Sequence, residues 1–219
     1  MKNTAICLGL LVSLLSAGAR ADEDYLPREQ LGDAKLVKYW QLQVDLSPGQ
    51  VVDRAYLVDD QIYVCTNDGY AYAIHAPTGA VRWLQRITRA GYPVPRPCHA
   101  DGKSVFVTPS EIFVLDKLFG DPVARKKLDF PGGSAGASDG NRVFCGGIDR
   151  RFYAFGVSDL FEDWAVLTEG PITSTPAIFR DYLYVASDDG RVYACNSANK
   201  RFQWRAETYA AITADLVAT

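Results

Sequence analysis

The chain contains an internal repeat of about 40 residues, and its tryptophans mark the period. Trp40, Trp83, Trp164 and Trp204 are separated by 43, 81 and 40 residues, and the middle interval equals two periods. A repeat unit of this size buries its apolar face only against its neighbours, so several units must stack to form one continuous core. The repeat therefore constrains the fold more than the length does, which alone would suggest one or two ordinary domains.

The repeat units agree in more than tryptophan. Residues 67–74 (Asn-Asp-Gly-Tyr-Ala-Tyr-Ala-Ile) match residues 188–195 (Asp-Asp-Gly-Arg-Val-Tyr-Ala-Cys) at an offset of 121, and residues 148–155 match the first block at 81. Every unit also contains a run of alternating aromatic and β-branched residues, which is typical of a β-strand. These runs are 61–65, 104–107, 142–145 and 182–185.

Asp-Gly pairs predict tight turns between these strands. Asp68-Gly69 and Asp189-Gly190 each lie between two strand-like runs, where we expect type I′ hairpin turns with positive φ at both central residues. Asp101-Gly102 and Asp139-Gly140 predict further turns ahead of the strands of the second and third units. No window of helical length shows a sustained helical period beyond the N-terminal apolar run, so the expected fold class is all-β.

Strands grouped into units of about 40 residues predict a β-propeller of four-stranded antiparallel blades. About four blades are expected within a propeller region at 39–219. Partial blades are expected at both ends, because Trp40 stands in the position of a last strand and residues 212–217 resemble a first strand. The expected blades are 51–88, 94–130, 134–169 and 171–208.

Residues 73–83, Ala-Ile-His-Ala-Pro-Thr-Gly-Ala-Val-Arg-Trp, resemble the tryptophan-docking motif of PQQ quinoproteins, A-x-D-x-x-T-G-K-x-x-W. That family includes BamB-like propellers that bind no quinone. His75 replaces the aspartate of the motif and Ala80 the lysine, while the second unit keeps Gly120 but lacks the tryptophan. The resemblance implies that a Thr-Gly turn joins the two outer strands and that the indole packs across the blade interface onto the neighbouring turn.

Propellers of this family usually have seven or eight blades, so the resemblance also implies an incomplete ring. The chain is then a truncated piece, a half-ring that pairs with another copy, or an unusual small closed ring. We favour truncation, because residues 216–219 end inside a strand-like run. An open arc leaves strand edges unpaired, so we expect self-association of residues 22–219 through the open propeller edges.

The N-terminus predicts export. Lys2 precedes an apolar run at 5–17, and residues 19–21 (Ala-Arg-Ala) have the small-x-small form of a signal-peptidase site. We therefore expect a signal peptide at 1–21, a linker at 22–38, and a periplasmic or cell-envelope location. The apolar run is short for a bilayer span, so the cleaved chain is not expected to span a membrane. Removing residues 1–21 leaves a net charge near −5, which disfavours nucleic acid as a partner.

The candidates for chemistry are few, and we expect no catalytic, cofactor-binding or metal-binding residues. His75 and His99 are the only histidines, and both are interpreted as ordinary loop residues. The Asp-Gly turns lack the further oxygen ligands of a calcium loop. Residues 132–136 (Gly-Gly-Ser-Ala-Gly) only superficially resemble a phosphate loop and are expected to link two blades.

Four cysteines remain after the predicted cleavage, and their number permits three disulfide pairings in an oxidising compartment. We favour free, buried thiols, because three of the four replace small hydrophobic residues within strands of different blades. The four are Cys65, Cys98, Cys145 and Cys195.

The functional hypothesis is an exported, non-enzymatic scaffold that binds a protein or cell-envelope partner, as BamB-like relatives do in outer-membrane assembly. The alternative is a fragment of a quinone-dependent oxidoreductase whose catalytic residues lie outside this chain. Loops at 89–97, 131–139 and 158–163 are the candidate binding surfaces, and Tyr92 and Arg96 would suit an interface.

Overall fold

The structure is a computed structural model, and it describes residues 28–33, 35–197 and 200–217. The signal peptide predicted at 1–21 lies outside these residues. The predicted linker is described in part and contains the short helix α1 (Arg28–Asp33). Among the described residues, no helix is long and apolar enough to cross a membrane.

The strands form four separate sheets of four strands each across the described residues. In every sheet, consecutive strands lie side by side and run antiparallel. The strands of the first two sheets are β1 (Val52–Val58), β2 (Gln61–Thr66), β3 (Tyr70–His75), β4 (Val81–Arg86), β5 (Cys98–Ala100), β6 (Lys103–Val107), β7 (Glu111–Asp116) and β8 (Pro122–Lys127). Those of the last two are β9 (Ala137–Ser138), β10 (Arg142–Gly146), β11 (Arg151–Gly156), β12 (Glu162–Leu167), β13 (Ala177–Phe179), β14 (Tyr182–Ser187), β15 (Arg191–Asn196) and β16 (Arg201–Glu207).

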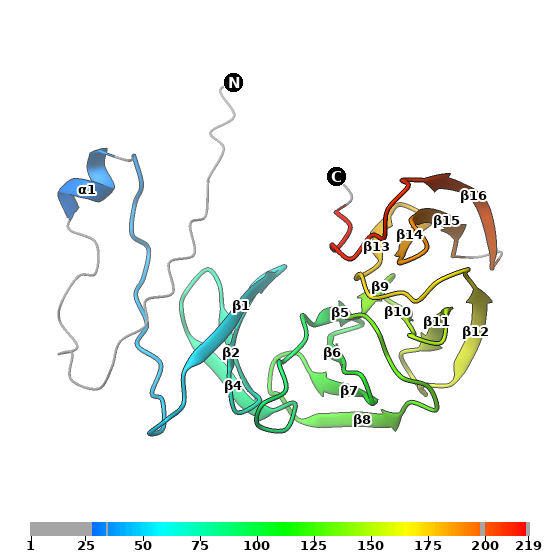
Figure 1. Cartoon of the computed structure of the whole chain (residues 1–219). Coiled ribbons are helices and arrows are strands. Elements are labelled where there is room, and N and C mark those ends of the chain that lie inside the picture. Colours follow the sequence, from blue (N-terminus) through cyan, green and yellow to red (C-terminus); the bar gives the residue numbers. More distant parts are fainter. Residues whose placement is uncertain (1–27, 34, 198–199, 218–219) are drawn as a thin grey trace.

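The four sheets follow one another around an open arc (Figure 1). The short strands β5, β9 and β13 line the inside, where β9 contacts both of the others, and the last strands β8, β12 and β16 lie outside. Neighbouring sheets are not hydrogen-bonded into one continuous sheet. This arrangement of separate radial sheets confirms the all-β propeller prediction.

The hydrophobic core lies between the sheets. Apolar side chains on one face of a sheet pack against those of the next sheet, as Tyr63 does with Phe106. Similar clusters join the second sheet to the third and the third to the fourth. A fourth cluster covers the other face of the first sheet with Trp40, Leu42 and Val44, which belong to no strand. Stacking of neighbouring units therefore forms the core, as the repeat predicted.

The predicted type I′ turn at Asp68-Gly69 is wrong, although the hairpin is present. Gly69 has a φ of 90° while Asp68 keeps a negative φ, and Gly69 N donates to Thr66 O over 3.0 Å. The loop thus has three residues, a turn followed by a left-handed glycine, and Gly190 (φ 80°) repeats it in the fourth sheet. The two-residue turn with positive φ at both positions occurs instead at Asp101-Gly102 (φ 44° and 70°).

Antiparallel strand order gives each sheet two different ends. We call one the linker end, because it carries the second-to-third strand turns and the segments that join sheets. The other is the docking end, which carries the first-to-second and third-to-fourth strand turns. The glycine-rich segment 132–136 runs between β8 and β9 on the linker side, where Gly132 pairs with Gly147 and Gly133 N donates to Gly146 O, so it links two blades as predicted.

Candidate functional site

Indoles dock onto turns of the following sheet at the docking end. Trp40 donates from Nε1 to Ala76 O over 2.7 Å, and its ring lies against Gly79. A Cβ at Gly79 would come within 2.6 Å of that ring, so only glycine fits. The resemblance implied this packing of an indole across the blade interface, and the structure confirms it.

Trp83 repeats the arrangement one blade further on. Its Nε1 donates to Lys117 O over 3.0 Å, and its ring packs on Gly120, whose φ is 75°. Gln61 Nε2 donates to the same carbonyl oxygen over 2.7 Å. The turn of the second sheet is therefore held by two residues of the first.

The second sheet has no tryptophan to dock, and aromatic contacts replace it. Ala124 stands where Trp83 stands in the first sheet, opposite the middle of the third strand. At the junction with the third sheet, Phe130 stacks on Tyr153 with ring centroids 3.7 Å apart. These stacked rings seal a junction that lacks the indole.

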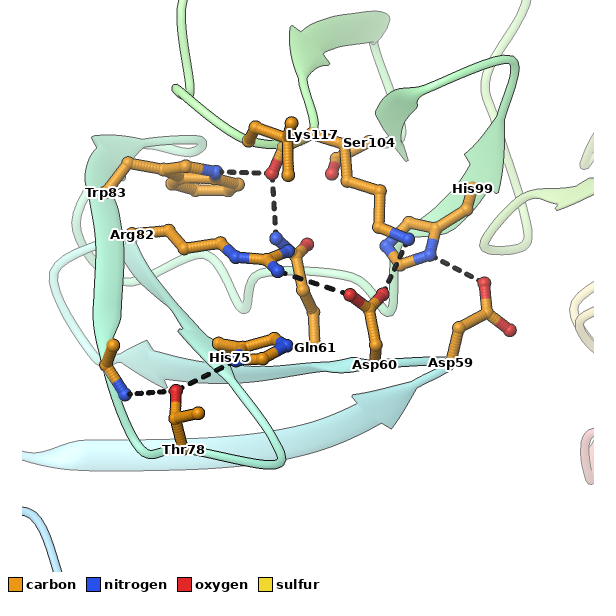
Figure 2. Close-up of polar contacts among 12 residues, drawn as sticks. Asp59, Asp60, Gln61, His75, Thr78, Arg82, Trp83, His99, Ser104 and Lys117 are labelled. Atoms are coloured by element: carbon orange, nitrogen blue, oxygen red, sulfur yellow. Dashed lines mark hydrogen bonds and ion pairs between the residues drawn. The ribbon is translucent and has the colours of Figure 1, made fainter.

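Polar contacts cross the junction between the first two sheets, and Figure 2 shows two of them, from Asp59 to His99 and from Asp60 to Lys117. The Tyr63 hydroxyl, from β2, lies 2.7 Å from His99 Nε2 and 2.7 Å from Ser104 Oγ, both from the second sheet. It also donates to Gln61 Oε1. Tyr63, Gln61 and Ser104 have no solvent-accessible surface, and desolvation raises the pKa of Tyr63. The network therefore joins buried polar side chains of the two sheets in the interior.

His99 is not the ordinary loop residue that was predicted. It lies in β5, and its side chain is 9% exposed. Its Nδ1 contacts Asp59 Oδ2 at 2.7 Å while its Nε2 faces Tyr63, so it bridges two sheets. Burial lowers the pKa of His99 below its usual 6.5, although the hydrogen bond to Asp59 acts in the opposite direction.

An ion pair lies beside this network. Asp60 Oδ1 is 2.6 Å from Lys117 Nζ, and Asp60 Oδ2 accepts from Arg82 Nη2 over 3.3 Å. The Lys117 hydrogen bond lowers the pKa of the Asp60 carboxyl to about 2. Lys117 thus contacts the first sheet through its side chain and through its carbonyl oxygen, which strengthens the same junction.

This arrangement is suited to holding blades together. Both ring nitrogens of His99 are engaged, and Ser104 is buried against Tyr63, so neither presents a reactive atom to solvent. The described residues contain no group of three or more His, Cys, Asp or Glu that could hold a metal ion. His75 is placed at the end of β3, where Nδ1 contacts Thr78 Oγ1 at 2.8 Å and braces the docking turn.

The four predicted free cysteines are free and buried in the structure. Burial raises the pKa of Cys65 and Cys98 to about 12 and that of Cys195 to about 11, and it raises the pKa of Cys145 as well. Such thiols are almost entirely protonated at neutral pH, which makes them poor nucleophiles.

The three candidate binding loops do not form one surface. Residues 89–97 and 131–136 lie at the linker end, whereas Asp139 belongs to the first-to-second strand turn and residues 158–163 contain the third-to-fourth strand turn of the third sheet, both at the docking end. Tyr92 is 63% exposed and Arg96 is exposed, so both are available at the linker end.

The sequence profile of the PQQ_2 family, described as outer membrane protein assembly factor BamB, matches residues 108–218, half of the chain. The chain belongs to this family. The solved structure of BamB from Moraxella catarrhalis is similar to this BamB-family chain with a TM-score of 0.58 and 23% identity, covering 73% of this chain and 53% of that one. None of the curated proteins matches the chain.

A chain from the crystal structure of a mitotic checkpoint complex is similar at 11% identity, with a TM-score of 0.64, covering 78% of this chain and 55% of that one. This BamB-family chain therefore spans about half the length of these two solved chains. At such identities the likeness shows the fold.

Sequence reasoning missed the residues that join the first two sheets by polar contacts. Tyr63 and Gln61 were assigned to a strand and given no partner, and Asp59 was not considered. The sequence offered one signal, which is Gln61. This glutamine stands two residues before Tyr63, at a position where a buried strand would be expected to carry a hydrophobic residue. A polar residue at such a position needs a partner, but the sequence does not say which.

Proposed function

We propose that this chain is an exported, non-enzymatic β-propeller scaffold of the cell envelope that supports outer-membrane protein assembly by binding a protein partner. The observation that carries the proposal is the BamB family match over residues 108–218. Export is proposed from the signal peptide predicted at 1–21.

The best-supported partner surface is the segment 89–97, which joins the first two sheets at the linker end. Its backbone is anchored: Thr88 Oγ1 donates to Tyr92 O over 2.8 Å, and Gly91 N donates to Asn67 O over 3.1 Å. Val94 is buried, and its carbonyl accepts from Tyr56 over 3.2 Å. An exposed tyrosine on an anchored backbone can bind with little loss of conformational freedom, and tyrosine is enriched at protein interfaces.

The use of buried polar groups supports a scaffold over an enzyme. The His99, Tyr63 and Ser104 side chains contact one another across a blade junction. The Thr78-Gly79 turn, which carries the resemblance to quinoproteins, packs on Trp40. Both features are used for the architecture of the ring.

Site-specific photocrosslinking in the periplasm of a Gram-negative host tests the proposal. A photoreactive amino acid at position 92 samples the linker end, and the matched control at Phe119, which is 71% exposed, samples the docking end. We expect a specific crosslink from position 92 to a component of the outer-membrane assembly machinery and none from position 119.

Two outcomes contradict the proposal. Retention of the chain in the cytoplasm with its N-terminus intact would exclude an envelope function. Saturable binding of PQQ, with quinone-dependent oxidation of an alcohol or sugar, would instead favour the oxidoreductase hypothesis.

A further inference from the structure

The segment 89–97 belongs to the longest part of the chain that contains no acidic residue. Residues 69–100 include four arginines and neither aspartate nor glutamate, although the net charge of the whole chain is −3. Positive charge is therefore concentrated beside the first blade junction in a chain that is acidic overall. Such a local concentration of one sign of charge favours a partner of the opposite sign.

Two of the four arginines are exposed and have no acidic partner. Arg89 and Arg96 are both exposed, and neither forms an ion pair with any residue that the structure describes. Arg82, in contrast, is paired with Asp60.

Arg86 is engaged within the first sheet. Its guanidinium lies over the Tyr70 ring, 5.8 Å from the ring centroid. Asp68, in the turn that precedes Tyr70, is attracted electrostatically by Arg86, so these two charges partly offset each other. The uncompensated positive charge of this surface therefore belongs to Arg89 and Arg96.

A tight turn places Arg89 beside Tyr92. Tyr92 N donates to Arg89 O over 3.1 Å, and Gly91 supplies the left-handed residue of the turn with a φ of 84°. The Cα atoms of the first and fourth residues of such a turn are less than about 7 Å apart. A guanidinium and a phenol, both exposed, are therefore presented together on an anchored backbone.

Prolines restrict the second half of the segment. Arg96 stands between Pro95 and Pro97, and Pro97 is buried. Proline fixes its own φ near −65° and also favours an extended backbone at the residue before it, here Arg96. The backbone at Arg96 is thus already restricted, and binding costs it little conformational freedom.

We propose that the segment 89–97 binds an acidic, extended polypeptide segment of the partner protein, whose carboxylates pair with Arg89 and Arg96 while Tyr92 packs on its backbone. The proposal rests on the proposed function, because it names the chemistry of the partner at the same surface. The planar guanidinium can donate two parallel hydrogen bonds to one carboxylate, which gives geometric specificity in addition to charge attraction.

The exposed side chains favour a polypeptide over an anionic lipid bilayer. Among the described residues 89–97, Tyr92 is the one large apolar side chain that is exposed, since Val94 is buried. Binding at a bilayer surface requires a larger apolar face that enters the acyl boundary. Two arginines with a single tyrosine are better suited to carboxylates on a polypeptide.

Fluorescence anisotropy of the exported full chain with a labelled peptide of alternating glutamate and serine tests the proposal. We expect saturable binding that weakens as salt is added, and no binding of the same peptide with glutamine in place of glutamate. Arg89→Glu and Arg96→Glu should each raise the dissociation constant about tenfold or more, as for loss of a charge-assisted hydrogen bond. The matched control, Arg180→Glu, makes the same charge change at an exposed docking-end arginine and should leave the constant nearly unchanged.

Three results would overturn the proposal. The first is the absence of saturable binding of the glutamate peptide at low salt. The second is an equal loss of affinity in Arg180→Glu, which would show that net charge and not this surface attracts the peptide. The third is preferential binding to phosphatidylglycerol vesicles that is lost in Arg89→Glu and Arg96→Glu, which would assign the surface to a bilayer. Circular dichroism on each variant separates loss of binding from loss of folding.

Crosslinking from position 92 distinguishes failure of this proposal from failure of the proposed function. Loss of the crosslink in Arg96→Glu, with its retention in Arg180→Glu, supports both. An undiminished crosslink in Arg96→Glu contradicts the acidic segment and leaves the proposed function standing. No crosslink from any chain, together with peptide binding that depends on Arg89 and Arg96, contradicts the proposed function alone.

Discussion

The indole-on-glycine contact allows a quantitative test with two matched glycines. Gly120 and Gly102 have similar left-handed backbones, with φ of 75° and 70°. A Cβ at Gly120 would lie 2.5 Å from Trp83 Cγ, whereas one at Gly102 would meet nothing within 4 Å. Gly102→Ala therefore measures the backbone cost alone, and Gly120→Ala adds the displacement of the indole.

The expected magnitudes follow from these two terms. A non-glycine residue with a left-handed backbone lowers the free energy of unfolding by about 1–2 kcal/mol, and both variants incur this cost. At Gly120 the methyl group must push the Trp83 ring away, which costs about 1–3 kcal/mol by overpacking and about 1 kcal/mol for the weakened bond to Lys117 O. Gly120→Ala should thus destabilise the protein by about 2–4 kcal/mol more than Gly102→Ala.

The free energy of unfolding of each variant is measured by urea unfolding, with circular dichroism as the probe. Each glycine substitution is measured alone and in combination with Trp83→Ala. Once the indole is absent, the added methyl group has space, so the cost of Gly120→Ala should fall to that of Gly102→Ala. A cost at Gly120 equal to that at Gly102 with Trp83 present would refute the reasoning. So would a cost that is unchanged by removing the indole.

Three further predictions concern protonation, thiols and export. Because burial lowers the pKa of His99, the unfolded state binds its proton more readily; stability should fall as pH drops below about 6.5, and His99→Gln should flatten this dependence in unfolding curves measured across pH. Thiol titration of the exported chain should return four thiols under denaturant and almost none in the native state; a lower count under denaturant would indicate a disulfide. Mass spectrometry of the exported chain should show an N-terminus at Asp22, and a retained Met1 would contradict the predicted cleavage.

Much of the fold was predictable because each blade is encoded locally. The tryptophan period and the alternating runs identify the β2, β6, β10 and β14 strands, since a strand exposes its two faces in strict alternation. The docking of an indole on a turn was also expected, because residues 73–83 resemble the tryptophan-docking motif of PQQ quinoproteins. The turn at Asp68-Gly69 was not, since the number of loop residues depends on how the flanking strands pair, Cys65 with Ala71.

The blade junction was beyond local reasoning. His99 and Ser104 meet Tyr63 from another sheet, 36 and 41 residues further along the chain. The repeat period predicts that the faces of neighbouring blades will meet. Hydrogen bonds between side chains of different blades, however, require those side chains to be positioned to within a fraction of an ångström. His99 was therefore interpreted as a loop residue when it is a buried bridge.

The sequence by itself determined the repeat and the strands, because these follow from side-chain periodicity within a blade, and its resemblance to the docking motif implied the indole-and-turn pairs. Only the tertiary structure decided which of four chemically similar tryptophans is covered. Trp83 and Trp164 are buried because a following sheet packs on each, and Trp204 is exposed because no described residue covers its face. Burial depends on what lies beyond the blade, and that is a property of the assembled ring.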